Sequence, residues 1–419
     1  MHPETTPIDI ARADMLNAIT PRTAHEKVPL LASIGRFAAS DIVSTVNLPA
    51  TANAAVDGYA IDAETLAANP DHLFPIAGQA RAGHPFTGVV AKDEAVEIYT
   101  GAIMPDGVNA VAMHEDCTRH DNHVRLDKML QSGANNRPAG ENLAVGEMIL
   151  SAGTRIHAPM IGQLAAAGYN SIDVQNRLSA TVLSTGDEIV DGVADDLADI
   201  GAAGNPVATG QIYDANRPML MATLADEALT LHNGGVVADD RDALASAYQS
   251  ALDHSDIVIS SGGASDGIED HTQAAMKMVG AECALWRLAM KPGRPMAVGR
   301  VDDKFIFCLP GNPVAAFVCT KLLILPLLDK LAGGIARTPL RVTVPAGFAH
   351  KKKPGRAEYL RATLQGSGKD QQIQLHGRRG AGVISSLTGA DGLVEIPLDN
   401  ADVEVGMPLV FLPFADRGL

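Results

Sequence analysis

Aromatic side chains are scarce in this 419-residue chain: they make up 4% of it, and there is one tryptophan. Proteins that bind single-stranded nucleic acid stack the bases on aromatic side chains, so this class of protein is not indicated. Positive charge is scarce as well, since 33 Lys and Arg stand against 49 Asp and Glu, a formal net charge of −16. This charge argues against broad contact with nucleic acid or an anionic membrane, although a local basic cluster can still bind a small anion.

Cysteines and long apolar runs are also few. The four cysteines form no CxxC pair and show no zinc-ligand spacing, so a structural zinc site is not expected. The most apolar segment, Leu322–Leu328, is short and contains Pro326, which predicts a buried helix and no membrane span. Met1–Asp14 contains no signal-peptide core. We therefore expect a cytoplasmic protein that binds neither membranes nor nucleic acid.

The composition that remains is globular, with 46% hydrophobic and 20% charged residues, and the length suffices for roughly three domains. The pattern in Ile8–Ile19 predicts an amphipathic helix that ends before Pro21. From Val28 to about Gly146, short apolar strands alternate with turns rich in Gly, Pro, Asn and Asp, which predicts a β-rich domain. Gly153–Gly168 predicts a turn and a short connecting helix.

From Leu178 to about Gly334, short apolar strands alternate with helices of about ten residues or more. This alternation predicts a doubly wound α/β domain with a mostly parallel sheet and helices on both faces. The expected strands are Ala180–Leu183, Val236–Val237, Ile257–Ile259 and Phe305–Leu309. The expected helices are Arg217–Leu229, Asp242–Leu252, His271–Val279 and Val314–Leu331. After Pro339 short strands return, which predicts a small C-terminal β domain.

Three of the expected strands run into loops that contain glycine: Ser184–Glu188 (STGDE), Ser260–Gly267 (SSGGASDG) and Pro310–Ala315 (PGNPVA). Loops at the carboxyl ends of parallel strands share one edge of the sheet, where doubly wound proteins bind ligands. Glycine lets backbone N–H groups approach a ligand, and helix starts favour phosphate. We therefore predict an anion site here, against the alternative of plain strand-to-helix turns. The residues expected to bind the substrate are Ser184, Gly186, Gly262, Gly263, Pro310, Gly311 and Asn312.

Carboxylates collect near the same loops. They are Asp187, Glu188, Asp239, Asp240, Asp266, Glu269 and Asp270. Helix capping is the alternative explanation, and Asp270 before the helix expected at His271 fits it well. Several carboxylates beside a bound phosphate would repel it unless a cation lies between them. Mg²⁺ suits such an edge because it holds few protein carboxylates and keeps its waters.

Basic residues cluster in the segment WRLAMKPGRP. Arg287, Lys291 and Arg294 stand within eight residues, and Pro292 and Gly293 favour a strand or a loop there. A solvated surface is the alternative. In a chain this acidic, a local anion site explains the cluster better.

Polar loops also interrupt the β-rich region. Asp57 precedes Gly58 in VDGYA, Thr100 follows a strand in YTGAIMP, and Arg137 and Glu141 lie in NRPAGENLAVGE. Each of these loops alone is typical of an ordinary turn. No Ser/His/Asp order and no HExxH helix stands out anywhere in the chain.

Taken together and in order, the loops resemble the molybdopterin molybdenumtransferase family, which includes the E domain of gephyrin. The similar segments cover nearly the whole chain: VDGYA, YTGAIMP, AGEN, STGDEIV, GQIYDANRPML, VISSGGAS, LAMKPGRP, LPGNPVA and KKPGRAEYLR. One such motif would mean little, but nine in this order are specific.

The resemblance implies an elongated subunit of four parts. They are a β-rich domain (28–146), an α/β molybdopterin-binding domain (178–335), a C-terminal β domain (336–419) and a discontinuous linking domain (1–27 with 147–177). It also implies a homodimer with an active site between the α/β domain of one subunit and the β-rich domain of the other. The implied reaction consumes adenylylated molybdopterin and molybdate and yields AMP and molybdenum cofactor, with Mg²⁺ as cofactor. The pterin adenylyltransferase is an implied partner protein.

Position by position, the resemblance carries functional roles over to residues of this chain. The positions expected at the reacting centre are Asp57, Thr100, Glu188 and Asp270, and further substrate-binding positions are Arg137, Asp239, Arg287, Lys291 and Arg356. Lys291 and Mg²⁺ would neutralise phosphoryl oxygens while a phosphoanhydride breaks. Asp57, Glu188 and Asp270 would hold or orient the metal, and Arg137 or Arg356 would bind molybdate.

The chain also departs from the family pattern. The departures are Ala54, Val56, Asn142, Arg287, Ala315 and Ala381. Asn142 lacks a charge, and Ala381 lacks a hydroxyl that would be able to contact molybdate. Two alternatives therefore stay open: an enzyme like the molybdopterin adenylyltransferase, and a non-catalytic paralogue that binds or carries the cofactor.

Overall fold

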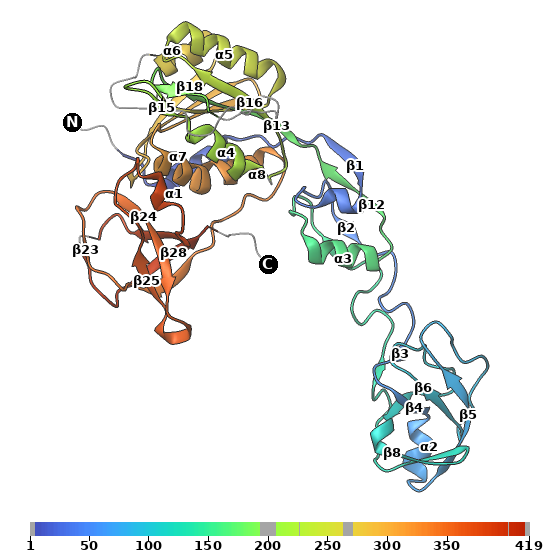
Figure 1. Cartoon of the computed structure of the whole chain (residues 1–419). Helices are drawn as coiled ribbons and strands as arrows, with labels where there is room; N and C mark the ends of the chain where they lie inside the picture. Colours follow the sequence, from blue (N-terminus) through green and yellow to red (C-terminus); the bar gives the residue numbers. More distant parts are fainter. Residues whose placement is uncertain (1–4, 193–206, 226, 263–270, 401, 415–419) are drawn as a thin grey trace.

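The computed structural model describes residues 5–192, 207–225, 227–262, 271–400 and 402–414. The subunit is elongated (Figure 1), with the α/β domain and the C-terminal β domain at one end and the β-rich domain at the other. A small linking domain stands between them, built from two segments because the chain runs out to the β-rich domain and returns. Within the described ranges, no helix has the length and apolar character needed to cross a membrane.

The linking domain pairs strands that lie on opposite sides of the β-rich domain in the sequence. β1 (His25–Pro29) pairs antiparallel with β12 (Ser171–Gln175), and β2 (Ile42–Val43) pairs antiparallel with β11 (Met148–Leu150). α3 (Ala158–Ala166) packs on these strands and has Pro in its first turn, where the missing N–H costs no helix hydrogen bond. The core is small and aliphatic: Val28, Leu30, Ile42, Leu150, Ile156, Leu164, Ile172 and Val174.

The N-terminal helix α1 (Ile8–Ala18) packs outside the core of the linking domain. Its buried side chains Ile8, Ala11 and Met15 belong to the core of the α/β domain. The resemblance groups residues 1–27 with the linking domain, whereas the apolar stripe of this helix lies on the larger core next door.

A six-stranded sheet forms the β-rich domain. Its order is β7 (Ala110–Met113), β4 (Gly58–Ile61), β6 (Ala95–Ile98), β5 (Leu73–Ala80), β9 (His123–Leu126) and β8 (Cys117–His120). Tyr59 and Ile61 of β4 face one small core together with helix α2 (Ala63–Ala68), and Ala60 faces a second core. The short strands β3 (Asn53–Ala54) and β10 (Asn136–Arg137) pair antiparallel beside this sheet.

The α/β domain has the predicted doubly wound architecture. Its sheet order is β16 (Leu229–Val237), β13 (Leu178–Thr185), β17 (Ile257–Ser261), β21 (Lys304–Leu309), β20 (Pro295–Val301) and β18 (Glu282–Arg287). The first four strands are parallel to one another, β20 runs antiparallel to β21, and β18 runs antiparallel to β20. The covering helices are α5 (Arg241–His254) and α6 (His271–Met278) on one face, and α4 (Asn216–Leu224), α7 (Pro313–Cys319) and α8 (Leu325–Leu331) on the other. Helices on both faces of a mostly parallel sheet confirm the predicted fold class.

The most apolar segment is a buried helix, as predicted, but it is not regular. α7 and α8 are joined by a π-helical turn at Thr320–Ile324. Pro326 has no backbone N–H to donate to the preceding turn, and the wider turn accommodates this loss without ending the helix.

The C-terminal domain is built on a sheet that includes a strand from the α/β domain. The order is β19 (Met290–Lys291), β24 (Ala357–Gln365), β26 (Gly392–Ile396), β28 (Pro408–Pro413) and β22 (Val342–Pro345), with β25 (Gln372–Leu375) also paired to β24. β23 (His350–Lys351) pairs with β27 (Asp402–Val403). Because β19 of the α/β domain pairs with β24 of the C-terminal domain, the two domains share a sheet. The WRLAMKPGRP segment, which contains β19, is therefore held between the two domains.

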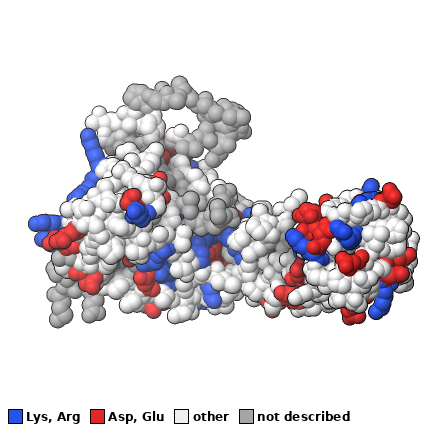
Figure 2. Space-filling model, turned by 90° about the horizontal axis from the view of Figure 1, so that it is seen from below, with Lys and Arg blue, Asp and Glu red and all other residues white. Residues whose placement is uncertain are grey.

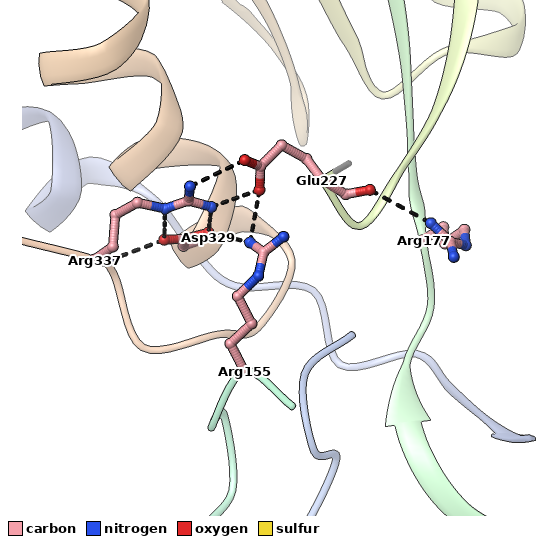
Figure 3. A network of polar contacts seen from close by, with 5 residues as sticks. All are labelled: Arg155, Arg177, Glu227, Asp329 and Arg337. Atoms are coloured by element: carbon pink, nitrogen blue, oxygen red, sulfur yellow. Dashed lines mark hydrogen bonds and ion pairs between the residues drawn. The ribbon is translucent and has the colours of Figure 1, made fainter. Parts of the chain in front are cut away.

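An ion network of low exposure ties three parts of the subunit together (Figure 3). Arg155 of the linking domain contacts Glu227 at 2.6 Å and Asp329 at 3.4 Å, both in the α/β domain. Arg337, in the segment that leads to the C-terminal domain, contacts the same two carboxylates at 2.6 Å each. Burial acts to raise the pKa of Glu227, but the hydrogen bonds and charges of the two arginines outweigh it, and the pKa lies below its ordinary value. The network therefore holds the linking domain against the α/β domain.

Candidate active site

A cavity of about 1100 Å³ lies between the α/β domain and the C-terminal domain, and we call it the interdomain cavity. The three glycine-containing loops all reach it, because they leave the same edge of the sheet. The predicted site residues that line it are Ser184, Gly186, Glu188, Asp239, Gly262, Lys291, Pro310, Gly311 and Asn312.

The remaining predicted residues that the structure describes lie elsewhere. Arg287 is on β18 and Arg356 is in an exposed loop, and neither lines the cavity. Asp57, Thr100 and Arg137 belong to the β-rich domain at the other end of the subunit (Figure 1). Gly263 and Asp270 lie outside the described residues.

Asp214 and Asn216, for which no role was predicted from the sequence, organise the α/β side of the cavity. The Ser184 hydroxyl donates to Asp214 Oδ1 at 2.9 Å, and the buried Arg217 donates from Nε to Asp214 Oδ2 at 3.0 Å. Asn216 donates from Nδ2 to Ser261 Oγ at 2.8 Å and to the carbonyl oxygen of Gly311 at 2.7 Å. One asparagine thus joins the loops after β17 and β21. The motif GQIYDANRPML contains both residues, but their contacts depend on segments distant in the sequence.

Several buried polar atoms at this cavity have no hydrogen-bond partner among the described residues. They are Thr185 Oγ1, Asn216 Oδ1, Asp239 Oδ1 and His350 Nδ1. Buried polar atoms are normally paired, by protein or by another molecule, so the concentration of such atoms at one cavity is consistent with a ligand site.

Glycine is required where the loops meet most closely. Gly262 has a φ of +113°, and a Cβ there would stand 2.3 Å from the carbonyl oxygen of Thr185. No L-residue with a side chain fits this contact, so the approach of the two loops depends on glycine.

The opposite wall of the cavity is basic. Its cations are Lys291, Arg294, Lys351, Arg361 and Arg379. Arg361 is buried and donates from Nε to Ser386 Oγ at 2.8 Å and from a terminal nitrogen to the carbonyl oxygen of Arg378 at 3.0 Å. It thereby holds the loop that carries Arg379 and Ala381. This concentration of positive charge in a chain of net charge −16 favours an anionic ligand.

The charge distribution differs along the subunit (Figure 2). On the face shown, Lys and Arg gather toward the middle, whereas Asp and Glu are densest at the end formed by the β-rich domain. The electrostatic field therefore attracts an anion more strongly to the half of the subunit that contains the cavity than to the β-rich end.

In the β-rich domain, two predicted residues of separate loops meet. Asp57 Oδ1 accepts hydrogen bonds from the backbone N of Thr100 at 2.7 Å and from its hydroxyl at 2.8 Å. These two bonds lower the pKa of the exposed Asp57 carboxyl below its ordinary value. A Cβ at the neighbouring Gly58 would stand 1.7 Å from the carbonyl oxygen of Ala112, so glycine permits the close approach of β7 here. Arg137 forms an exposed ion pair with Glu141 at 2.6 Å.

The predicted magnesium ligands are divided between the two ends of the subunit. Glu188 is at the interdomain cavity, Asp57 is in the β-rich domain, and Asp270 is outside the described residues. Among the described residues, no three His, Cys, Asp or Glu side chains are grouped closely enough to hold a metal ion. Glu188 and Asp57 are nevertheless exposed carboxylates, the ligand type that Mg²⁺ prefers.

Two departures from the family pattern meet at the cavity. Ala315 and Ala381 both line it, and the backbone N of Val314 donates to the carbonyl oxygen of Ala381 at 3.0 Å. Ala54 is buried and Val56 packs against the same small core in the β-rich domain. Asn142 is exposed, and its backbone N donates to the carbonyl oxygen of Leu48.

Comparison with known families covers nearly the whole chain. Residues 6–168 match the MoeA N-terminal region (domain I and II), residues 181–330 match a probable molybdopterin binding domain, and residues 343–414 match the MoeA C-terminal region (domain IV).

Individual relatives agree with these matches. The molybdopterin molybdenumtransferase of Haemophilus influenzae is 31% identical over 97% of this chain and 98% of its own length. Molybdopterin molybdenumtransferase 2 of Mycobacterium tuberculosis is 30% identical over 95% of this chain and 96% of its own. A solved structure of the molybdopterin biosynthesis MoeA protein from Pyrococcus horikoshii has a TM-score of 0.75 at 27% identity, covering 99% of this chain and all of that one.

Proposed function

Because the chain belongs to the molybdopterin molybdenumtransferase family, we propose that it inserts molybdate into adenylylated molybdopterin and releases AMP, so that molybdenum cofactor is formed. The observation that carries the proposal is the interdomain cavity, where three loops at the carboxyl edge of a parallel sheet face a basic wall. This arrangement suits a ligand with phosphates at one end and an oxyanion bound nearby.

The residues at the cavity support a phosphoryl reaction. As the phosphoanhydride between pterin phosphate and AMP breaks, negative charge grows on the phosphoryl oxygens, and Lys291 would stabilise it. Mg²⁺, when bound, would add positive charge to the same oxygens. Glu188 lines the cavity and would orient a metal or its waters, while Asn216 and Asp214 keep the loops in position.

A shared active site would account for the separation of the predicted residues. We propose a homodimer in which the β-rich domain of one copy approaches the interdomain cavity of the other. Asp57 and Thr100 are exposed and held together, as expected of residues that complete a site formed with another surface. The pterin adenylyltransferase, which would supply the substrate, and a cytoplasmic location remain parts of this proposal.

The adenylyltransferase alternative is less well supported. Such chemistry needs the α/β domain alone, whereas the family matches include the N-terminal and C-terminal regions as well. A non-catalytic carrier is the second alternative, and the alanines at positions 315 and 381 are its specific support.

AMP release from adenylylated molybdopterin is the test, measured with and without molybdate and with and without Mg²⁺. We expect release that depends on both. Adenylylation of free molybdopterin by the protein and ATP would instead support the first alternative. Tight binding of the adenylylated pterin without AMP release would support the carrier.

A further inference from the structure

One carboxylate connects a cation in the interdomain cavity to a buried histidine. Glu358 Oε1 accepts a hydrogen bond from Lys291 Nζ at 3.0 Å, and its Oε2 accepts one from His350 Nε2 at 2.8 Å. The three residues come from β19, β23 and β24, and Lys291 stands opposite Glu358 in the parallel pairing of β19 with β24. The contact therefore crosses from the α/β domain to the C-terminal domain.

The three side chains differ sharply in exposure. Glu358 and His350 are each 8% exposed, whereas the Lys291 side chain is 59% exposed. Burial acts to raise the pKa of Glu358, but the hydrogen bonds from His350 and Lys291 outweigh it and hold the pKa below its ordinary value. The carboxylate thus stays ionised inside the C-terminal domain while the ammonium group remains accessible at the cavity wall.

We propose that His350 is a positioning residue for the anion site: it holds Glu358 so that this carboxylate aims the Lys291 ammonium into the interdomain cavity. This inference rests on the proposed function, in which Lys291 binds a phosphate of the adenylylated pterin. An ammonium group has three N–H donors, so Lys291 keeps two for a ligand after donating one to Glu358. Without a fixed partner, a long lysine side chain would sample many rotamers and pay more entropy on binding.

The ionised state of Glu358 identifies the donor in the buried pair. An ionised carboxylate accepts hydrogen bonds and does not donate them, so His350 donates from Nε2. Glutamine can place an amide N–H near the position of Nε2, whereas asparagine is too short and leucine has no donor. These substitutions separate a role in hydrogen bonding from a role in filling space.

The experiment measures the reactivity of Lys291 directly, without any ligand. Purified full-length protein is labelled with a trace of acetic anhydride, and acetylation of each lysine is quantified by mass spectrometry. We expect H350L and H350N to raise the labelling rate of Lys291 about threefold to tenfold, because a loosely held amine loses the protection of one charge-assisted hydrogen bond. H350Q should stay within about twofold of the parent protein.

Lys128 provides a matched control on the same molecule. Its ammonium lies 2.5 Å from Asp116, and the two side chains are 69% and 15% exposed, so this pair also joins an accessible lysine to a shielded carboxylate. It belongs to the β-rich domain, and its labelling should not change in any His350 variant. An unchanged rate for Lys291 in both H350L and H350N, or an equal rise in H350Q, would overturn the proposal.

Turnover supplies an independent readout. With the adenylylated pterin as substrate, H350L should lower kcat/KM about threefold to tenfold, because a displaced Lys291 both binds the phosphate and stabilises its growing charge less well, and H350Q should restore kcat/KM. If the parent protein releases no AMP, the proposed function fails, but the labelling experiment still decides the role of His350. If AMP is released normally and the labelling rate of Lys291 is the same in every His350 variant, the role of His350 is refuted while the proposed function stands.

Discussion

Thr100 holds a single oxygen of Asp57 with two hydrogen bonds, one from its backbone N at 2.7 Å and one from its hydroxyl at 2.8 Å. The two residues lie 43 positions apart, in motifs that each resemble an ordinary turn when taken alone. Their contact lowers the pKa of Asp57, so the carboxylate is ionised throughout the neutral range. A fixed, ionised and exposed carboxylate is suited to act on a ligand that another surface brings to it.

The first prediction concerns Asp57 and Glu188, the two carboxylates that we propose act at the reacting centre. D57A and E188A should each slow molybdate-dependent AMP release by about 100-fold or more, the scale of losing a positioned acid–base or metal-orienting group. Both residues lie in exposed loops, so the thermal unfolding of the variants should be unchanged. Single-turnover AMP release by purified variants is the measurement.

Asp127 is a matched control for Asp57. It is also an exposed carboxylate of the β-rich domain, and it accepts a hydrogen bond from the Thr118 hydroxyl at 2.8 Å that lowers its pKa. D127A should therefore retain the parent rate. Parent-like turnover by D57A and E188A together would show that the active site lies elsewhere.

Mixing the two inactive variants tests the shared active site. In a hybrid dimer, one of the two sites combines an intact Asp57 from one subunit with an intact Glu188 from the other. Random exchange makes half of the dimers hybrid, so the mixture should recover about a quarter of the parent activity. Size-exclusion chromatography with light scattering should show a dimer, and a differently tagged pair should prove exchange. A monomer, or no recovery after proven exchange, would refute the arrangement.

The sequence predicted the α/β framework because alternating strands and helices leave a strong local pattern. Helices α5 and α6 begin within a residue of their expected starts, and the three loops leave the strands as predicted. The antiparallel strands β18 and β20 were not predicted, because their pairing depends on β21 and on each other more than on any local signal. β16 was predicted as Val236–Val237 alone, since Asn233, Gly234 and Gly235 interrupt its apolar pattern.

The site was predicted in part for a similar reason. Glycines, carboxylates and basic residues mark a loop as chemically unusual. These residues predicted a ligand site at the sheet edge that borders the interdomain cavity. Contacts between loops leave no such mark, so Asp214, Asn216 and the pairing of Glu358 with Lys291 and His350 became evident only in three dimensions. Lys291 itself was predicted as a cation for an anionic ligand, but its carboxylate partner 67 residues later was not.

That partner sharpens the prediction for Lys291. K291A should weaken binding of the adenylylated pterin by about 1.5–3 kcal/mol, the scale of a charge-assisted hydrogen bond, and K291R should recover part of the loss. Part of the effect in K291A would come from Glu358, whose charge then repels the ligand, so K291A/E358Q should bind more tightly than K291A. Calorimetric titration measures all three dissociation constants.

Arg287 is the comparison residue for this series. It lies on β18 outside the interdomain cavity, and R287K should change the dissociation constant by less than about twofold. An unchanged dissociation constant in K291A would remove Lys291 from the site.

The last prediction concerns the ion network that joins the linking domain to the α/β domain. R337M replaces one of the two arginines drawn against the carboxylates of Glu227 and Asp329 with an apolar side chain of similar length. Arg155 still contacts both carboxylates in Figure 3, whereas Arg177 contacts the backbone carbonyl of Glu227. Under-compensated buried charge is destabilising, so the free energy of unfolding should fall by about 2–4 kcal/mol at pH 7. Urea denaturation followed by far-ultraviolet circular dichroism measures this, because the α/β domain contains helices α4, α5, α6, α7 and α8.

The pH dependence of the free energy of unfolding shows whether R337M loses stability through charge or through packing. The folded pKa of Glu227 lies below its unfolded value of 4.5, so the stabilisation it receives is fully present above pH 4.5 and disappears as pH falls through the folded pKa. The difference between the parent protein and R337M should therefore be largest near neutral pH and shrink on acidification below pH 4.5. In R337M/E227Q/D329N, neutral amides replace the two buried carboxylates, so this variant should regain part of the stability at pH 7. If R337M loses the same free energy at acidic and neutral pH, lost packing and not lost charge compensation is responsible, and the network does not act through its charges.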